Sequence, residues 1–148
     1  ACGLPVALAF HKNSYVGRTF IKPTQKERES AVHLKLSVLS SVVKGKRLVL
    51  IDDSIVRGTT MASLIRMLKD AGATEVHVRI SSPPFLFPCY YGTDVPSNDQ
   101  LIASSHTAAE ICASIGADSL GYMKLEDLKQ MTGDLPLCKA CFDSHYPV

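Results

Sequence analysis

The sequence lacks an apolar run of the about 18 residues that a membrane-spanning helix needs. It has no block of lysines and arginines, and its formal net charge is only +2. These two absences argue against membrane insertion and against general nucleic-acid binding. No basic and apolar leader typical of a signal peptide opens the chain, which favours the cytosol. Internal repeats and low-complexity segments are absent as well.

What is present indicates one ordinary globular domain. The chain has 148 residues, of which 46% are apolar and 20% are charged, enough to build a buried core. The first residues, "ACGLPVALAF", read as a strand already under way without a starting methionine, so we expect a longer protein truncated at its N-terminus. Five cysteines, an odd number spread over the chain, do not resemble a secreted disulfide framework.

Hydrophobic periodicity predicts strands that alternate with helices. Strands are predicted at 5–10, 48–51, 76–80 and 119–123, and helices at 31–43, 60–70, 108–115 and 125–131. Residues 48–51 are apolar without interruption, as expected of a parallel strand covered on both faces. Thr59 or Thr60 is expected to cap the second helix, and "TAAE" from Thr107 predicts a capping box. The fold class is therefore α/β with a parallel sheet.

The stretch "LVLIDDSIVRGTT" places two aspartates directly after a buried strand, where α/β sheets bind their ligands. Adjacent carboxylates repel each other unless a cation or hydroxyl groups bind them. The loop after them runs into a helix N-terminus, which favours a phosphate. Neither the Walker A pattern nor G-x-G-x-x-G is present, so a ribose phosphate explains the combination best. The alternative is one aspartate that caps a turn while the other is solvated.

This stretch resembles the thirteen-residue phosphoribosyl pyrophosphate (PRPP) signature of type I phosphoribosyltransferases. Together with "KNSYVGRTFIKP" and "EVHVRISSPP" it resembles the glutamine PRPP amidotransferase family, of which the chain would be the latter part. The resemblance implies a Rossmann-like type I phosphoribosyltransferase fold over residues 1–133, with a flexible hood loop at about 11–35. Residues 134–148 would form a cysteine-containing tail.

The resemblance also implies a set of PRPP-binding residues. Asp52 and Asp53 would hold the ribose hydroxyls and Mg²⁺, and the loop after them would bind the 5-phosphate. Cationic and aromatic residues of the hood would face the pyrophosphate, although a basic loop of this kind can also be simply solvated. The implied PRPP-binding residues are Asp52, Asp53, Ser54, Ile55, Val56, Arg57, Gly58, Thr59, Thr60, Lys12, Tyr15, Arg18 and Lys35.

The implied reaction transfers ammonia, derived from glutamine in the whole enzyme, to PRPP and yields 5-phosphoribosylamine and pyrophosphate, the first step of purine synthesis. No residue is expected to act as a nucleophile, because positioning and charge stabilisation suffice. Purine nucleotides would bind as inhibitors at the PRPP site, and the whole enzyme would be a homo-oligomer. The alternatives are a nucleobase phosphoribosyltransferase and a PRPP-sensing module without catalysis.

The cysteines match one branch of the resembled family, which holds a [4Fe–4S] cluster. Cys89 in "FPCYYG" and the pair Cys138 and Cys141 in "CKAC" match three of its four ligands. The fourth ligand, like a further metal- or substrate-binding residue, would lie upstream of Ala1. Cys112 is expected to be a core thiol, and Cys2 is unassigned.

Overall fold

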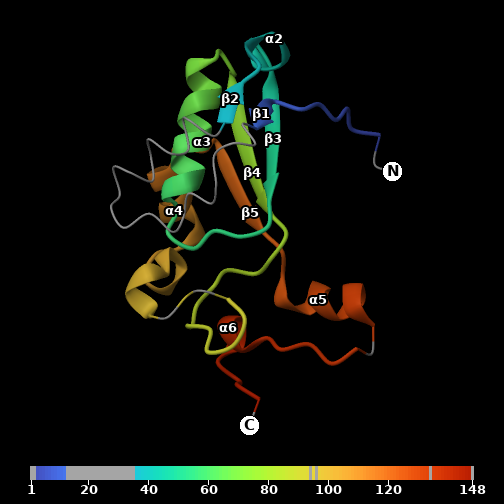
Figure 1. The fold of residues 1–148 in the computed structure, drawn as a ribbon, viewed down its shortest axis with the longest axis vertical. Coiled ribbons are helices and arrows are strands. Elements are labelled where there is room, and N and C mark those ends of the chain that lie inside the picture. The colour runs from blue at the N-terminus through green and yellow to red at the C-terminus, as the bar shows by residue number, and fades with distance from the viewer. Residues whose placement is uncertain (1–2, 13–35, 94, 96, 134, 148) are drawn as a thin grey trace.

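A three-stranded parallel sheet forms the centre of the structure, a computed structural model that describes residues 3–12, 36–93, 95, 97–133 and 135–147. Its strands are β3 (Arg47–Asp52), β4 (Glu75–Ile80) and β5 (Ser119–Tyr122), in that spatial order. A separate antiparallel pair consists of β1 (Phe10–Lys12) and β2 (Leu36–Val38) (Figure 1). The predicted α/β class with a parallel sheet is confirmed.

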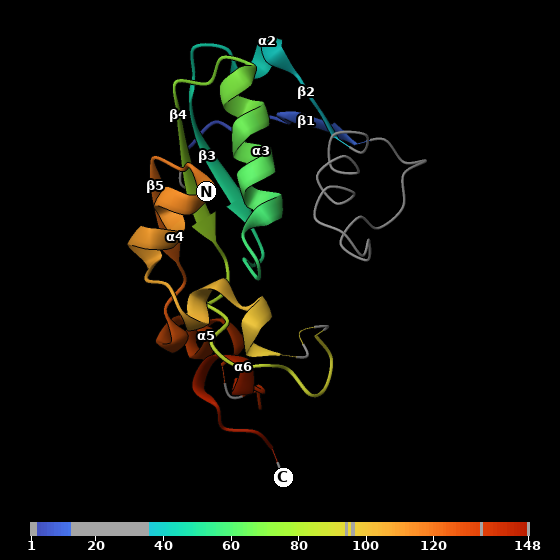
Figure 2. The ribbon, with the colours of Figure 1, turned by 90° about the vertical axis from the view of Figure 1, so that its left-hand side faces the viewer.

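Two helices make the crossovers of the sheet and lie on one of its faces. Helix α3 (Thr59–Asp70) connects β3 to β4, and α4 (Ala108–Ile115) connects β4 to β5. Right-handed crossovers that advance in one direction place their helices on the same face, as Figures 1 and 2 show. The core fills the space between this face and the helices, and its buried residues are Val43, Ile55, Met61, Ile65, Leu68, Val76, Val78, Ile80, Ile111 and Ile115.

The remaining helical elements are short. Helix α2 (Ser40–Val43) precedes β3, and α5 (Leu125–Thr132) and α6 (Ala140–Asp143) follow β5. Two 3-10 turns, η1 (Asn98–Gln100) and η2 (Ile102–Ser104), precede α4. In Figure 2 α5 and α6 lie beyond the carboxyl ends of the parallel strands. Within the part of the chain that the structure describes, no helix combines the length and apolar character needed to cross a bilayer.

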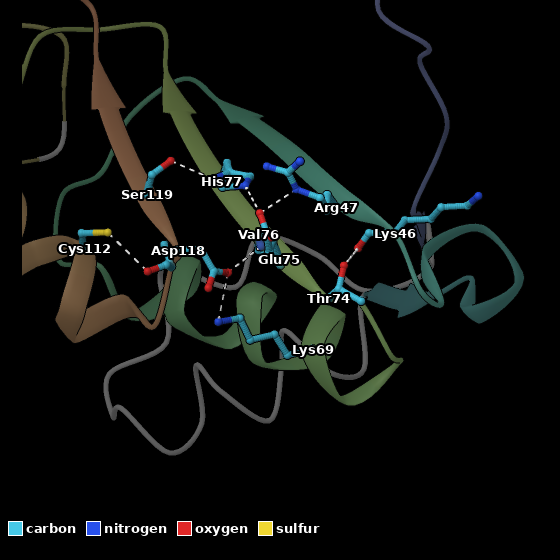
Figure 3. Close-up of polar contacts among 11 residues, drawn as sticks. Lys46, Arg47, Lys69, Thr74, Glu75, Val76, His77, Cys112, Asp118 and Ser119 are labelled. Atoms are coloured by element: carbon cyan, nitrogen blue, oxygen red, sulfur yellow. Dashed lines mark hydrogen bonds and ion pairs between the residues drawn. The ribbon is translucent and has the colours of Figure 1, made fainter.

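Polar side chains tie the three strands together on the face opposite the helices (Figure 3). Arg47 Nε donates to Glu75 Oε2 at 2.7 Å, and the same carboxylate oxygen lies 2.8 Å from His77 Nε2. His77 Nδ1 lies 2.9 Å from Ser119 Oγ on β5. Both ring nitrogens of His77 therefore have a partner, Glu75 on the same strand and Ser119 on β5, which explains this histidine without a ligand.

The prediction that both faces of residues 48–51 are covered is wrong. Val49 is 56% exposed and Ile51 is 72% exposed on the face opposite α3 and α4. Only Leu48 and Leu50 pack against the core. The apolar run correctly indicated a strand, but the direction of the crossovers decides which face receives a helix.

Two predicted elements near the start of the chain are also wrong. Residues 3–9 form no strand, and β1 begins only at Phe10, because pairing with β2 involves just Phe10 to Lys12. Helix 31–43 is replaced, within the described residues, by strand β2 and the single turn α2. Leu36 and Val38 are two residues apart, which places both side chains on one face of a strand, and pairing with β1 selected the strand.

Candidate functional site

The two acids lie where β3 ends. Asp52 is the last residue of β3, and its C=O accepts the backbone N–H of Ser81, which directly follows β4, at 3.0 Å. The backbone N–H of Asp53 donates to Asp52 Oδ1 at 2.9 Å. Ser54 Oγ donates to Asp53 Oδ1 at 3.2 Å. One acid is therefore half-buried against the sheet edge, and the next is exposed to solvent.

Burial raises the pKa of the Asp52 carboxyl, and the neighbouring charge of Asp53 adds to the rise. The hydrogen bond from the Asp53 backbone N–H opposes this rise in pKa without cancelling it. A cation or hydroxyl donors next to the pair would favour the ionised form of both acids. The site is thus suited to a positively charged or hydroxyl-bearing ligand.

Gly58 begins helix α3 in the left-handed conformation, with φ at 78°. The prediction that Thr59 or Thr60 caps this helix is wrong, because both lie inside the first turn and Gly58 is the N-cap. Gly58 has no side chain, so no cap hydrogen bond occupies the first N–H groups of the helix. An uncapped helix N-terminus next to a solvent-accessible loop offers N–H donors and a favourable dipole to an anion.

Residues distant in the sequence hold this loop by apolar packing and hydrogen bonds. Ile55 is buried, with 3% of its surface exposed, and belongs to the main core. The backbone N–H of Ile102 donates to the C=O of Val56 at 2.9 Å. Arg57 Nη2 donates to the amide oxygen of Gln100. The sequence analysis missed Gln100 and Ile102, because nothing in their local pattern links them to a loop more than forty residues earlier.

The predicted hood falls mostly outside the described residues. Tyr15, Arg18 and Lys35 lie outside them, and Lys12 ends strand β1 with an exposed side chain. His11 and Lys12 belong to β1, so the first two residues of the predicted loop at 11–35 are in a strand. The structure therefore brings together residues 52–60 of the predicted site, and the hood contribution stays a prediction.

Of the cysteines predicted as cluster ligands, Cys89 lies in the connection between β4 and η1, and Cys138 and Cys141 lie in the C-terminal tail. The backbone N–H of Thr93 donates to Cys89 Sγ at 3.4 Å, and N–H groups of Tyr91 and Thr93 lower the pKa of the Cys89 thiol. Burial raises the pKa of Cys141, to which charge on Cys89 and Cys138 adds. In the described ranges, no group of three or more His, Cys, Asp or Glu side chains is arranged to hold a metal ion. The ligand role of Cys89, Cys138 and Cys141 stays a prediction.

Two further observations concern this part of the structure. Cys112 is half-buried, and its thiol donates to the C=O of Ala117 at 3.3 Å (Figure 3). Cys112 was expected to be a core thiol, but it is half-buried and belongs to neither apolar cluster. A surface hollow of about 570 Å³ is lined by residues of the C-terminal tail, including Cys138 and Tyr146. It is shallow and contains none of residues 52–60, so it does not mark the candidate site.

Known proteins match this sequence over the candidate site and beyond it. The model of the phosphoribosyl transferase domain matches residues 3–81. Over its whole length the chain is 52% identical to an amidophosphoribosyltransferase of Synechocystis sp. and covers 30% of that protein. It is 51% identical to the amidophosphoribosyltransferase of Bacillus subtilis, with 99% of the chain and 32% of that protein covered.

A solved structure agrees with these relatives. The glutamine PRPP amidotransferase of B. subtilis, complexed with ADP and GMP, superposes with a TM-score of 0.82 at 52% sequence identity. The superposition covers 98% of this chain and 33% of that one, so the chain spans about a third of the length of its relatives. The match to the family model includes the acid pair, the loop after it and helix α3. The chain belongs to the phosphoribosyl transferase domain family.

Proposed function

We propose that this chain is the phosphoribosyltransferase part of an amidophosphoribosyltransferase, which transfers ammonia to PRPP. The observation that carries the proposal is 51–52% identity to enzymes of that name along the whole chain, beyond the family model that ends at residue 81. A phosphoribosyltransferase acting on a nucleobase would share the loop, but it would not be expected to share the 67 residues that follow residue 81. We place residues 1–133 in the transferase domain and residues 134–148 in a tail, and we assign the protein to the cytosol.

The loop geometry supports binding of a ribose phosphate. The 5-phosphate would lie at the N-terminus of α3, where Gly58 leaves the first N–H groups uncapped and Thr59 and Thr60 add hydroxyl donors. Backbone N–H groups of residues 54–58 would surround the same phosphate. Asp52 and Asp53 would accept hydrogen bonds from the ribose hydroxyls.

The acid pair also suits Mg²⁺, because carboxylate oxygens are ligands that this ion prefers. Asp53 is exposed and its neighbour is half-buried, so a hydrated ion bound with the substrate could reach both side chains. The ion would supply charge neutralisation for the pyrophosphate. Neutralising charge near Asp52 would also offset the effect of burial on this carboxyl.

The chain's own groups would act by position and charge. In the reaction the bond from C1 of the ribose to the pyrophosphate oxygen breaks, and its electron pair leaves with the pyrophosphate. The nitrogen of ammonia forms the new bond to C1 and loses a proton. Lys12, Tyr15, Arg18 and Lys35 would contact the leaving pyrophosphate and help to exclude water, which would otherwise hydrolyse PRPP.

A [4Fe–4S] cluster is part of the proposal for the complete protein. The donor chemistry of the chain suits it, because thiolates are the usual ligands and backbone N–H groups already point at the Cys89 sulfur. Cys138 and Cys141 would be two further ligands, and the fourth would come from outside this chain. The cluster would stabilise the tail, because the transfer reaction involves no electrons.

Purine nucleotides and a multi-subunit state complete the proposal. The matched B. subtilis protein was solved with ADP and GMP. A nucleoside monophosphate carries the same ribose 5-phosphate as PRPP, so it would compete for residues 52–60. Glutamine would supply the ammonia through another part of the complete protein, which we expect to be a homo-oligomer.

The proposal is tested by pyrophosphate release from PRPP with ammonia as the acceptor, in the natural full-length protein with Mg²⁺. Asp53→Asn should lower the rate about 100-fold, a loss typical of removing one preorganised charged group. Asp70→Asn is the matched control, because Asp70 is an exposed aspartate at the other end of α3. Equal rates for wild type and Asp53→Asn would contradict the catalytic proposal. PRPP binding without turnover would instead indicate a sensing module.

A further inference from the structure

The two 3-10 turns η1 and η2 contact the loop that follows the acid pair, residues 54–58, from one side. The backbone N–H of Ile102 donates to the C=O of Val56 at 2.9 Å, and the Gln100 amide oxygen accepts from Arg57 Nη2. A Cβ added to Gly58 would lie 3.2 Å from Ile102 Cδ1, so the turn and the loop are in close contact. Val56 and Arg57 are therefore hydrogen-bonded to the segment 98–104, and Gly58 lies close to it.

This segment is itself firmly anchored. Leu101 is 2% exposed and packs with Phe85 and Val95 in a second apolar cluster, against which Val56 also packs. Ser104 Oγ donates to the C=O of Leu101 at 2.7 Å and to that of Asn98 at 3.2 Å. The turn is therefore held by apolar packing and by its own hydrogen bonds, and Gln100 projects from a rigid base.

Holding the long, exposed side chain of Arg57 in one place costs rotamer entropy. A hydrogen-bond partner offsets part of this cost. The guanidinium group carries five N–H donors, and the bond to Gln100 directs one nitrogen toward the turn. A neutral amide orients the guanidinium without neutralising its charge, whereas a carboxylate at this position would form an ion pair. Arg57, the residue before the N-cap of α3, therefore keeps its positive charge.

We propose that Gln100 is a positioning residue that holds the Arg57 side chain in place to bind the 5-phosphate of PRPP. This inference rests on the function proposed above. Gln100 lies outside the matched family model and outside every sequence pattern considered for the site. It acts through Arg57 and contributes to binding of the phosphorylated ribose rather than to breaking the bond at C1. Its removal therefore raises the KM for PRPP and leaves kcat nearly unchanged.

The test uses Gln100→Leu in the natural full-length protein, with steady-state kinetics and calorimetric titration of PRPP. Loss of one hydrogen bond to a charged group should raise both KM and Kd about tenfold, with kcat within about twofold of wild type. Asn98→Leu makes the same chemical change on the same 3-10 turn, where the side chain is exposed. It should leave KM, Kd and kcat unchanged.

A double-mutant cycle with Arg57→Ala separates positioning from a purely structural role. If Gln100 acts through Arg57, the double variant binds PRPP as weakly as Arg57→Ala alone, and the two effects do not add. Additive effects, an unchanged Kd in Gln100→Leu, or equal losses in Gln100→Leu and Asn98→Leu would each overturn the inference. Wild type that neither binds nor consumes PRPP would overturn the proposed function itself, whereas normal wild-type turnover with an unaffected Gln100→Leu rejects only the positioning role.

Discussion

Asp53 donates its backbone N–H to Oδ1 of Asp52 at 2.9 Å, so the second acid of the pair holds the first in place. The bond directs the Asp52 carboxylate back toward the chain at the end of β3, while Asp53 remains exposed. The two adjacent carboxylates consequently have different surroundings. The half-buried one has a raised pKa because burial disfavours its charged form.

We expect Asp52→Asn to make the folded protein more stable at pH 7. A carboxyl whose folded-state pKa is raised stabilises the fold below the unfolded pKa of about 3.9, and this contribution is lost as the pH rises through the folded pKa. At pH 7 the ionised Asp52 is therefore a net cost, which asparagine removes while its oxygen still accepts the Asp53 N–H. Urea unfolding at pH 7 and at pH 3.5 measures the difference.

The gain from Asp52→Asn should shrink at the lower pH, where more of the native carboxyl is protonated. Asp70→Asn is the comparison, because Asp70 is an exposed aspartate at the far end of α3, away from the pair. A variant Asp52→Asn that is less stable than wild type at pH 7 would show that the carboxylate has a stabilising partner instead.

Gly58→Ala should lower the free energy of unfolding by more than the cost of the left-handed backbone conformation alone. The left-handed conformation costs a residue with a Cβ about 1–2 kcal/mol, and the new Cβ would lie 3.2 Å from Ile102 Cδ1 and 3.4 Å from Ile115 Cγ2. Gly116→Ala is the matched control, since Gly116 has a similar φ of 75° and no atom within 4 Å of an added Cβ. Equal free energies of unfolding for the two variants would show that the loop accommodates the added Cβ without a steric cost.

Thr107→Ala should lower the free energy of unfolding by about 1 kcal/mol, because the capping box of α4 loses its side-chain acceptor. Thr107 Oγ1 accepts from the Glu110 N–H at 3.3 Å, and Glu110 Oε2 accepts from the Thr107 N–H at 2.7 Å. Thr107→Ser retains the hydroxyl and should remain close to wild type in denaturant titrations. Equal stability of the alanine and serine variants would contradict the capping role.

Cys89→Ser should abolish visible absorbance and bound iron in the full-length protein purified without oxygen, if the thiol is a cluster ligand as proposed. Cys112→Ser is the control, because this thiol only donates to a backbone C=O and serine can make the same bond. Iron analysis and the absorbance spectrum give the readout. Full iron content in Cys89→Ser, or equal loss in both variants, would exclude a specific ligand role for Cys89.

Short-range patterns predicted much of the fold correctly. The stripe of Met61, Leu64, Ile65 and Leu68 predicted α3, and "TAAE" predicted the capping box of α4. The alternation in 76–80 predicted β4. These signals are reliable because hydrogen bonds and side-chain spacing within one element depend only on near neighbours in the chain.

Short apolar runs were more ambiguous. Leu36 and Val38 each belonged to a helix-like pattern with other residues of 31–43 and became a strand, because Phe10 and Lys12 supply the pairing backbone groups. The cap expected from Thr59 or Thr60 is instead Gly58, since the chain must turn through a positive φ where the loop meets Ile102. In each case a distant segment selected one of two conformations that were both compatible with the local pattern.

The order of residues alone determined that an acid pair, a small-residue loop and a helix start follow one another at the end of a strand. This arrangement is local, and it pointed to a phosphorylated sugar. The tertiary structure decided that Asp52 is half-buried, that Ile51 is exposed, and that Gln100 contacts Arg57. Burial and long-range contacts depend on how β3, its neighbouring strands and the 3-10 turns pack in space, which no local spacing encodes.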